Sequence, residues 1–447
     1  MYKGLILVWL CILLPLGGAL GQGNTSLSLV DAKTSELFVK KDWNALINEG
    51  KSAIDQGIDY YYLRVRLGVA YFEKGDYHQA AHHLEIAKEI NDEEEYVREY
   101  LYYAYLWSGR KFQARLISAG FSPQMKNKTQ TDGADLLDGL EFAYNYTGQV
   151  NQQVIDNFSA STNPQTEGYQ FIPRFHHYGF LGLDLNLGDR FKLYQGFSIL
   201  RATHLLYSQG NGVSFQNPSY ISDSWQYFLS GTYYLGQGFH FTAGGHFINN
   251  TFPLQEVQQM GNGQQALVVI QDQKDSDYLV FGGLSKNLTY LNLGANIFYG
   301  TINNGKQVQS DLNLTLFPGG NLNFYTFSVV TYQNQEFANA SSSQRIIFNQ
   351  ELGGKVTEFI WLEGYATFGE LENYFYKQGL VVFNRLDKIQ NRWGGRVIIL
   401  PNPQWKLTLD YTNFSNTSSF QTLPPSVEQN VKSYSLQSIT AILSWTF

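Results

Sequence analysis

Histidine and serine are the residue types in this chain that could support acid–base, nucleophilic or metal chemistry. His176 and His177 are adjacent, and neighbouring side chains of a strand point to opposite faces, so they cannot bind one metal ion together. His82 and His83 fall in a helical region, where we expect a solvated helix face. Serines are abundant, but there is no Gly-x-Ser-x-Gly motif and no local Ser/His/acid group. We therefore assign no catalytic, cofactor-binding or metal-binding residue, although a barrel hydrolase could assemble such groups across strands.

Aromatic and charged side chains offer a second kind of chemistry. Aromatic rings could stack on sugars along a path, or could form the interfacial girdles of a membrane barrel. We favour girdles, because aromatic residues at strand ends are a general property of such barrels. The aromatic residues in question are Tyr233, Tyr234, Tyr325, Phe327, Tyr374, Phe375 and Tyr376. By alternation, Asp184, Lys406 and Asp410 are expected to face the lumen, where charges either pair across the wall or set selectivity.

The elements that would position these residues are clearest at the end of the chain, where residues 434–447 alternate with a period of two. One face carries Ile439, Ala441, Leu443, Trp445 and Phe447. The other face is small and polar except for Ile442. A strand with one apolar face and a terminal aromatic residue suits the closing seam of a membrane barrel, although a soluble sheet could also end this way. It resembles the terminal strand by which outer-membrane barrels are recognised for insertion, which implies that the five apolar residues form the insertion strand.

The first residues are typical of a secretory signal peptide. Lys3 provides a positive charge, the stretch from Gly4 to Leu16 is apolar, and Ala19-Leu20-Gly21 has the pattern of a cleavage site. The apolar stretch is shorter than the roughly 20 residues that a membrane-spanning helix needs. Cleavage would remove Cys11, the single cysteine, and with it any disulfide, thiol catalysis or cysteine metal site.

The composition is unusual for a soluble enzyme. The chain has 31 Tyr, 31 Phe and 42 Gly but only 3 Met, and its net charge of -7 argues against nucleic acid as a partner. Beyond the leader there is no apolar run long enough for a helical membrane span. A polar chain that is rich in aromatic residues fits a barrel in which every second residue faces water.

Residues from about 30 to 120 are helical in character and repeat with a period of 34 residues. Leu67, Tyr71, Gly75 and Ala80 recur as Leu101, Tyr105, Gly109 and Ala114, and a degenerate earlier copy covers residues 38–43. Large residues of one helix would pack on alanines of the next, with glycine at the turn. The pattern resembles the tetratricopeptide repeat family, with a generic helical hairpin as the alternative. The resemblance implies a surface that binds another protein, for which we select Tyr71, Tyr77, Tyr105 and Trp107.

From about residue 137 the periodicity changes from helical to alternating. Runs such as 181–187, 291–297 and 405–411 alternate cleanly and are separated by glycine-containing turns. We expect longer polar loops near residues 151–167, 209–223, 250–276, 334–344 and 417–430. About fifteen strands can be counted, but a barrel with both ends on one side needs an even number, so we expect 14 or 16 and a miscount near residues 370–390.

These observations predict an α+β multidomain chain: a short α-helical solenoid of tetratricopeptide type followed by a transmembrane antiparallel β-barrel. The expected boundaries are a signal peptide at 1–21, a periplasmic helical domain at 22–121, a linker at 122–136 and an outer-membrane barrel at 137–447. A soluble β-sandwich or solenoid would not account for the leader, the aromatic content and the terminal strand together.

This domain order resembles the outer-membrane exopolysaccharide exporters and, in layout, the YaiO-like outer-membrane proteins. The resemblance implies a barrel in the outer membrane of a Gram-negative envelope, with its helical domain in the periplasm. The expected partners are outer-membrane lipid and a periplasmic or envelope protein, with polysaccharide as a further candidate and no nucleic acid. The function that we predict is a porin-like channel or export component that recruits a periplasmic partner. A non-conducting accessory subunit of an assembly or secretion machine is the alternative, and a barrel hydrolase the second.

Overall fold

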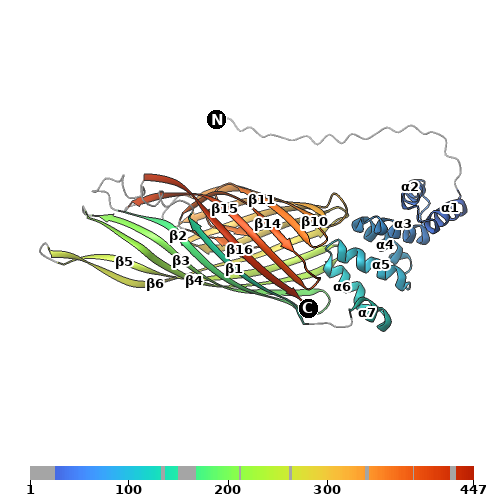
Figure 1. Ribbon diagram of the computed structural model, residues 1–447, viewed down its shortest axis with the longest axis horizontal. Coiled ribbons are helices and arrows are strands. Elements are labelled where there is room, and N and C mark those ends of the chain that lie inside the picture. The colour runs from blue at the N-terminus through green and yellow to red at the C-terminus, as the bar shows by residue number, and fades with distance from the viewer. Residues whose placement is uncertain are drawn as a thin grey trace, which may run out of the picture.

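The computed structural model describes residues 26–131, 136–149, 168–210, 213–260, 264–337, 342–385, 387–422 and 429–447. A helical domain leads into a long barrel, and the C-terminus lies at the barrel end nearest the helices (Figure 1). The predicted signal peptide and Cys11 lie outside the described residues. Within the described residues, no helix is both long and apolar enough to cross a membrane.

The helical domain is built from helices that follow one another at a regular interval. The helices are α1 (Leu27–Val39), α2 (Trp43–Asp55), α3 (Tyr61–Glu73), α4 (Tyr77–Ile90), α5 (Glu95–Trp107), α6 (Lys111–Ala119) and α7 (Pro123–Thr129). The starts of α1, α3 and α5 are 34 residues apart, as are those of α2, α4 and α6. Membership of the tetratricopeptide family stays a prediction. Helix α7 occupies part of the expected linker, because Ser122 caps its first turn and Pro123 suits its first position.

Consecutive helices of the domain approach closely where glycines replace larger residues. A Cβ atom on Gly50 would lie 2.7 Å from Cδ2 of Leu67, and one on Gly68 would lie 2.5 Å from Cγ of Leu84. Both leucines are fully buried in a core that alanines from α2, α4, α5 and α6 complete. The glycines therefore allow leucine side chains to pack directly on helix backbone.

The rest of the described chain forms a closed antiparallel barrel of 14 strands. These strands are β1 (Leu137–Gln149), β2 (Gly168–Asn186), β3 (Phe191–Gly210), β4 (Val213–Gly236), β5 (Phe239–Met260), β6 (Gln264–Asn287), β7 (Leu291–Ile302), β8 (Gly305–Leu316), β9 (Phe324–Phe337), β10 (Ser343–Thr357), β11 (Ile360–Phe368), β14 (Lys388–Ile399), β15 (Trp405–Thr422) and β16 (Gln429–Thr446). Strand β16 closes the barrel by pairing with both β1 and β15. The lower of the two expected strand numbers is correct, and the miscount near 370–390 coincides with two short strands that are not part of the barrel wall, β12 (Tyr374–Tyr376) and β13 (Val381–Phe383).

Two of the expected loops are wrong. Most of residues 209–223 and 250–276 belong to the long strands β3 to β6, whose hairpins extend beyond the rest of the barrel (Figure 1). Polar side chains suggested loops there. Antiparallel pairing, however, forms hydrogen bonds between backbone N–H and C=O groups, and these bonds do not depend on the polarity of the side chains. The expected loop at 151–167 lies outside the described residues.

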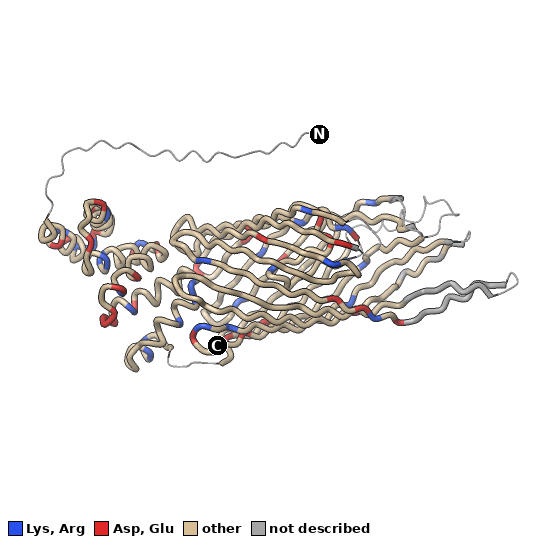
Figure 2. Tube along the Cα trace, turned by 180° about the vertical axis from the view of Figure 1, so that it is seen from behind, with Lys and Arg blue, Asp and Glu red and all other residues tan. Residues whose placement is uncertain are grey.

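The outward face of the barrel is apolar and exposed. Ile439, Leu443 and Trp445 on β16, and Phe447 directly after it, are 60%, 40%, 37% and 46% exposed, and Ala441 is exposed beside them. The alternation predicted from the sequence is therefore present, although a role of these residues in insertion stays a prediction. Trp445 stacks on Trp405 of β15 with ring centroids 5.0 Å apart. Charged residues are dense in the helical domain and sparse along most of the barrel trace (Figure 2), as expected for a wall that faces lipid.

The helical domain rests on turns at the near rim of the barrel. At the start of α4, the His78 amide donates to the Gly320 carbonyl over 3.0 Å, and the His78 ring stacks on Phe317 at 4.8 Å. Tyr290 donates its hydroxyl to Oδ2 of Asp76 over 2.8 Å. Burial, assisted by Arg110, lowers the pKa of His78 to about 3, so this histidine is neutral in the docked domain.

Helix α6 makes the second set of contacts with the rim. Arg110 donates to the Leu288 carbonyl over 2.9 Å, and Phe112 packs on the ring of His240 at 5.4 Å. In the two preceding helix pairs the position of Arg110 holds Asp42 and Asp76, whose carboxylates cap α2 and α4. The third pair thus has an arginine that contacts the barrel where the others have a cap.

Candidate functional site

A hairpin inside the lumen is the main feature of the barrel interior. Strand β11 is short, and after it residues 369–385 turn inward and form the β12–β13 pair. Phe375 packs on Phe298 within an apolar cluster from β4 to β7. Tyr374, Tyr376 and Phe383 pack into a second cluster from β2, β10 and β14 to β16. Because these clusters lie on different parts of the wall, the hairpin spans the lumen between them.

Glutamine side chains of the wall pair with the hairpin backbone as a neighbouring strand would. Gln309 donates to the Phe375 carbonyl over 2.7 Å and accepts the Phe375 amide over 3.0 Å. Gln307 and Gln333 donate to the carbonyls of Asn373 and Glu372, each over 2.8 Å. All three glutamines are essentially fully buried. They satisfy hairpin backbone groups that would otherwise be buried without partners.

A charged network fastens the hairpin near its tip to strands β10, β11, β14 and β15, which follow β8 and β9 around the wall. Arg396 of β14 contacts Asp410, Glu363 and Glu351 at 2.6, 2.7 and 3.0 Å. Tyr376 of the hairpin donates its hydroxyl to Glu351 over 2.6 Å. The guanidinium of Arg392 lies 4.1 Å from the centre of the Tyr376 ring, within the range of a cation–π contact. Both the ring and the hydroxyl of Tyr376 are therefore held.

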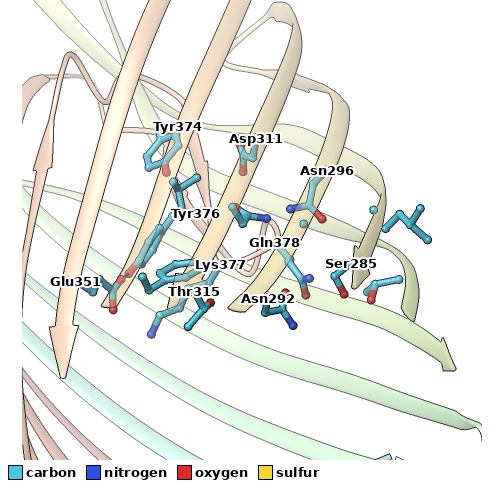
Figure 3. Close-up of a pocket in the computed structure, with 17 residues that line it drawn as sticks. Ser285, Asn292, Asn296, Asp311, Thr315, Glu351, Tyr374, Tyr376, Lys377 and Gln378 are labelled. Carbon is cyan, nitrogen blue, oxygen red and sulfur yellow. Dashed lines mark hydrogen bonds between the residues drawn. The ribbon is translucent and has the colours of Figure 1, made fainter. Parts of the chain in front are cut away.

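A cavity of about 380 Å³, lined by both polar and apolar residues, lies beside the hairpin tip. Figure 3 shows hairpin residues on one side of the cavity and side chains of β6, β7 and β8 on the other. The polar residues that line it are Thr242, Ser285, Asn292, Asn296, Asp311, Asn313, Thr315, Glu351, Tyr374, Tyr376, Lys377 and Gln378. The volume falls in the lower part of the range for small-molecule sites.

The backbone at the hairpin tip is in an uncommon conformation. Lys377, Gln378 and Gly379 follow one another with φ of 51°, 56° and 80°. Left-handed backbone is uncommon for residues with a side chain, and such residues are frequent at functional sites. His246 of the wall hydrogen-bonds the Gly379 carbonyl at 2.8 Å. The tip places Lys377 and Gln378, both exposed, in the open space of the lumen.

The preference for lipid-facing aromatic girdles is wrong for most of the residues that suggested it. Only Tyr233, which is 42% exposed, lies on the outside of the barrel. Tyr374, Phe375 and Tyr376 belong to the hairpin, and Phe327 lines the cavity. Tyr325 donates to Glu363, and Tyr234 is buried near Phe112 of α6. Alternation alone could not show that residues 374–376 leave the wall.

The charged residues expected in the lumen have two different surroundings. Asp410 is part of the Arg396 network, and Asp184 pairs with Lys192 at 3.1 Å nearer the helical domain. Lys406 lies on the same face of β15 as Asp410 and is exposed. Arg392, Arg396 and the glutamines of β8 and β9 were not predicted from the sequence as residues of a site. The signal was present in the run Gln307-Val-Gln309-Ser-Asp311, where every second residue is polar.

Each of the two histidine pairs has one buried and one exposed member. His176 is buried and His177 is exposed, where Tyr144 contacts it at 2.7 Å, so the two lie on opposite faces. His82 is solvated as expected, but His83 is buried on Arg64 and Tyr71, because the helix turns it into the core. In the described part of the chain, no three His, Cys, Asp or Glu side chains are grouped to hold a metal ion.

The four residues selected for a partner surface are not equivalent. Tyr71 and Tyr105 are 6% and 7% exposed, so their side chains belong to the helical core. These two residues are therefore not available on the surface for a partner, in contrast to the expectation from the sequence. Trp107 is 43% exposed and contacts Tyr77, with ring centroids 5.0 Å apart. Trp107 and Tyr77 remain candidates for binding another protein.

Comparison with known proteins identifies no family: no family model matches the chain, and no curated protein matches its sequence. Among solved structures, the P. putida toluene transporter TodX has a TM-score of 0.45 at 8% identity, covering 70% of this chain and 91% of TodX. A Pseudomonas aeruginosa FadL homologue has a TM-score of 0.40 at 9% identity, covering 70% and 90%. The monoaromatic hydrocarbon channel CymD has a TM-score of 0.38 at 8% identity, covering 69% and 89%. Likeness of this degree transfers no substrate to this chain.

Proposed function

We propose that this protein is a channel of the outer membrane in which the hairpin at residues 369–385 narrows the lumen to a path for small solutes. The observation that carries the proposal is the cavity beside a hairpin that spans the barrel. An apolar outer face supports a position in lipid, and the Trp405–Trp445 stack is of the kind found in interfacial girdles. In this proposal the helical domain lies in the periplasm.

The hairpin argues against passage of a polymer. Its residues are held by wall glutamines, by Arg392 and by two apolar clusters, so a chain could pass only after the hairpin had left the lumen. Release would expose Phe375 and would break each of these contacts together. A small solute can use the cavity with the hairpin in place.

Firm anchoring of the hairpin also favours a second candidate, a non-conducting accessory subunit that uses the barrel as an anchor. In either case we propose that the helical domain docks an envelope protein. This rests on the aromatic side chains that it leaves exposed, Tyr62, Tyr96 and Trp107, which are 59%, 45% and 43% exposed. Exposed aromatic residues are enriched at sites of protein–protein contact.

Conductance in planar bilayers separates the two candidates. We compare the full-length protein with a variant in which residues 371–385 are replaced by a short glycine–serine linker. Discrete current steps from the full-length protein, and larger steps from the variant, are expected for a narrowed channel. Current from the variant alone would identify a plugged barrel and favour the accessory subunit. No current from either, with folding confirmed by circular dichroism, would refute the channel.

A further inference from the structure

We infer that the cavity at the hairpin tip is a binding site for a neutral polyhydroxylated solute, such as a mono- or disaccharide. This inference rests on the proposed channel function and names its substrate class. It begins from the hydrogen-bonding groups that the cavity leaves unused. Among the described residues, no hydrogen bond engages the side chains of Ser285, Asn296, Asn313, Thr315, Lys377 or Gln378, all of which line the cavity.

These unused groups suit hydroxyl partners. A side-chain amide both donates and accepts, and a lysine ammonium donates up to three hydrogen bonds. Asn296 and Asn313 come from adjacent strands of the wall, and Gln378 comes from the hairpin, so both sides of the lining, wall and hairpin, supply amides. A solute with several hydroxyl groups can bond to both sides at once. Desolvation of the amides would then be matched by new hydrogen bonds.

The charges around the cavity favour a neutral solute over an ion. Arg396 forms ion pairs with the carboxylates of Glu351, Glu363 and Asp410. Asp311 accepts hydrogen bonds from Thr331 at 2.8 Å and from Gln309 at 3.0 Å. Lys377 is the one cation that lines the described cavity, and two carboxylates line it as well, so neither sign of charge dominates.

The lining also contains an aromatic ring that a sugar could contact. Phe327 is partly exposed, whereas Tyr374 and Tyr376, which also line the cavity, are 1% and 5% exposed. Aromatic side chains offer flat apolar faces, while the hydroxyl groups at the edge of a sugar need polar partners. A hydrocarbon would leave the amides of Asn296, Asn313 and Gln378 buried without partners, which disfavours that class of solute.

The test is isothermal titration calorimetry on the full-length protein in detergent, with glucose and maltose as neutral probes and gluconate as the anionic probe. We expect saturable binding of at least one neutral sugar and weaker binding of gluconate. Asn313→Leu keeps the side-chain volume and removes the amide, and should weaken binding about 3- to 10-fold, the effect of one hydrogen bond. Lys377→Asn removes the ammonium but suits left-handed backbone, and should weaken binding by a similar factor.

The control is Lys406→Gln, which removes a lysine on the lumen side of β15, outside the cavity lining, and should leave the affinity unchanged. No saturable binding of either sugar, or preference for gluconate, would overturn the inference. So would sugar binding that neither Asn313→Leu nor Lys377→Asn changes. Bilayer conductance of the same preparation keeps the two proposals separate: current without sugar binding refutes the site alone, and sugar binding without current refutes the channel alone.

Discussion

Replacement of Gln309 by leucine should release the hairpin from the lumen. The side chain of Gln309 holds both backbone groups of Phe375, at 2.7 and 3.0 Å. Leucine has a similar volume but can neither donate nor accept, so both groups would stay buried without partners while the hairpin is inside. Each such group costs about 1–3 kcal/mol, which gives about 2–6 kcal/mol against the inserted hairpin. The ratio of released to inserted hairpin should therefore rise by about 30-fold to 10⁴-fold.

Two assays follow this equilibrium. In planar bilayers, Gln309→Leu should increase the frequency of large-conductance events. In a background without Cys11, the single cysteine, a Gln378→Cys probe at the hairpin tip should react faster with a bulky maleimide when Gln309 is replaced. Gln437→Leu is the control, because Gln437 lies on the outward face of β16 in phase with Ile439. If conductance and labelling are the same in Gln309→Leu as in the control, then the glutamine contacts do not hold the hairpin and the reasoning is refuted.

Three further predictions concern the helical domain. Burial lowers the pKa of His83 to about 3, well below its unfolded value near 6.5, so the unfolded state binds the proton first and stability is lost as the pH falls below about 6.5. The loss should be about 2 kcal/mol at pH 5, and thermal melts of His83→Gln should show a flatter pH dependence; equal slopes would contradict it. Gly68→Ala should destabilise the domain by about 1–3 kcal/mol because its Cβ would meet Leu84 at 2.5 Å, and an unchanged melting temperature would count against that close approach. Arg110→Ala should loosen the domain from the rim through loss of its bond to Leu288, with faster amide exchange in the turn at 288–290 as the readout and unaltered exchange as the contrary result.

The regular parts of the fold could be predicted from the sequence because each follows from a local period. Alternation of apolar and polar residues placed Ile439 and Leu443 on the outside of β16, where they are exposed. The count of alternating runs, together with the even number that a barrel with both ends on one side needs, limited the strand number to two values, one of which is present. Residues 34 apart in sequence pointed to helix starts that are indeed 34 apart. Period and burial are linked directly in strands and helices, so these inferences needed no tertiary information.

The candidate site could be predicted only in fragments, because tertiary contacts create it. Residues 374–376 have the composition of a wall strand, and nothing local shows that they pair with residues 381–383 inside the lumen, where Gln309 of the wall bonds the Phe375 backbone. Lys377 and Gln378 look like an ordinary polar turn in sequence. Their position in the lumen depends on the short length of β11, which sends the chain inward. Burial of Tyr71 was not predicted for a similar reason. A tyrosine with a polar hydroxyl can lie on a surface, and only the tertiary structure shows that the ring of His83 stacks on it.

The position shared by Asp42, Asp76 and Arg110 restricts how this protein could have grown during evolution. A helix pair added by duplication at the N-terminal end would leave the joint, that is, the contacts between the helical domain and the barrel rim, intact. Asp76 and Arg110 would keep their contacts with Tyr290 and Leu288. A pair inserted after α6 would instead move the arginine away from the rim and leave the joint without it. Length variation among descendants of this chain should therefore be confined to the end remote from the barrel.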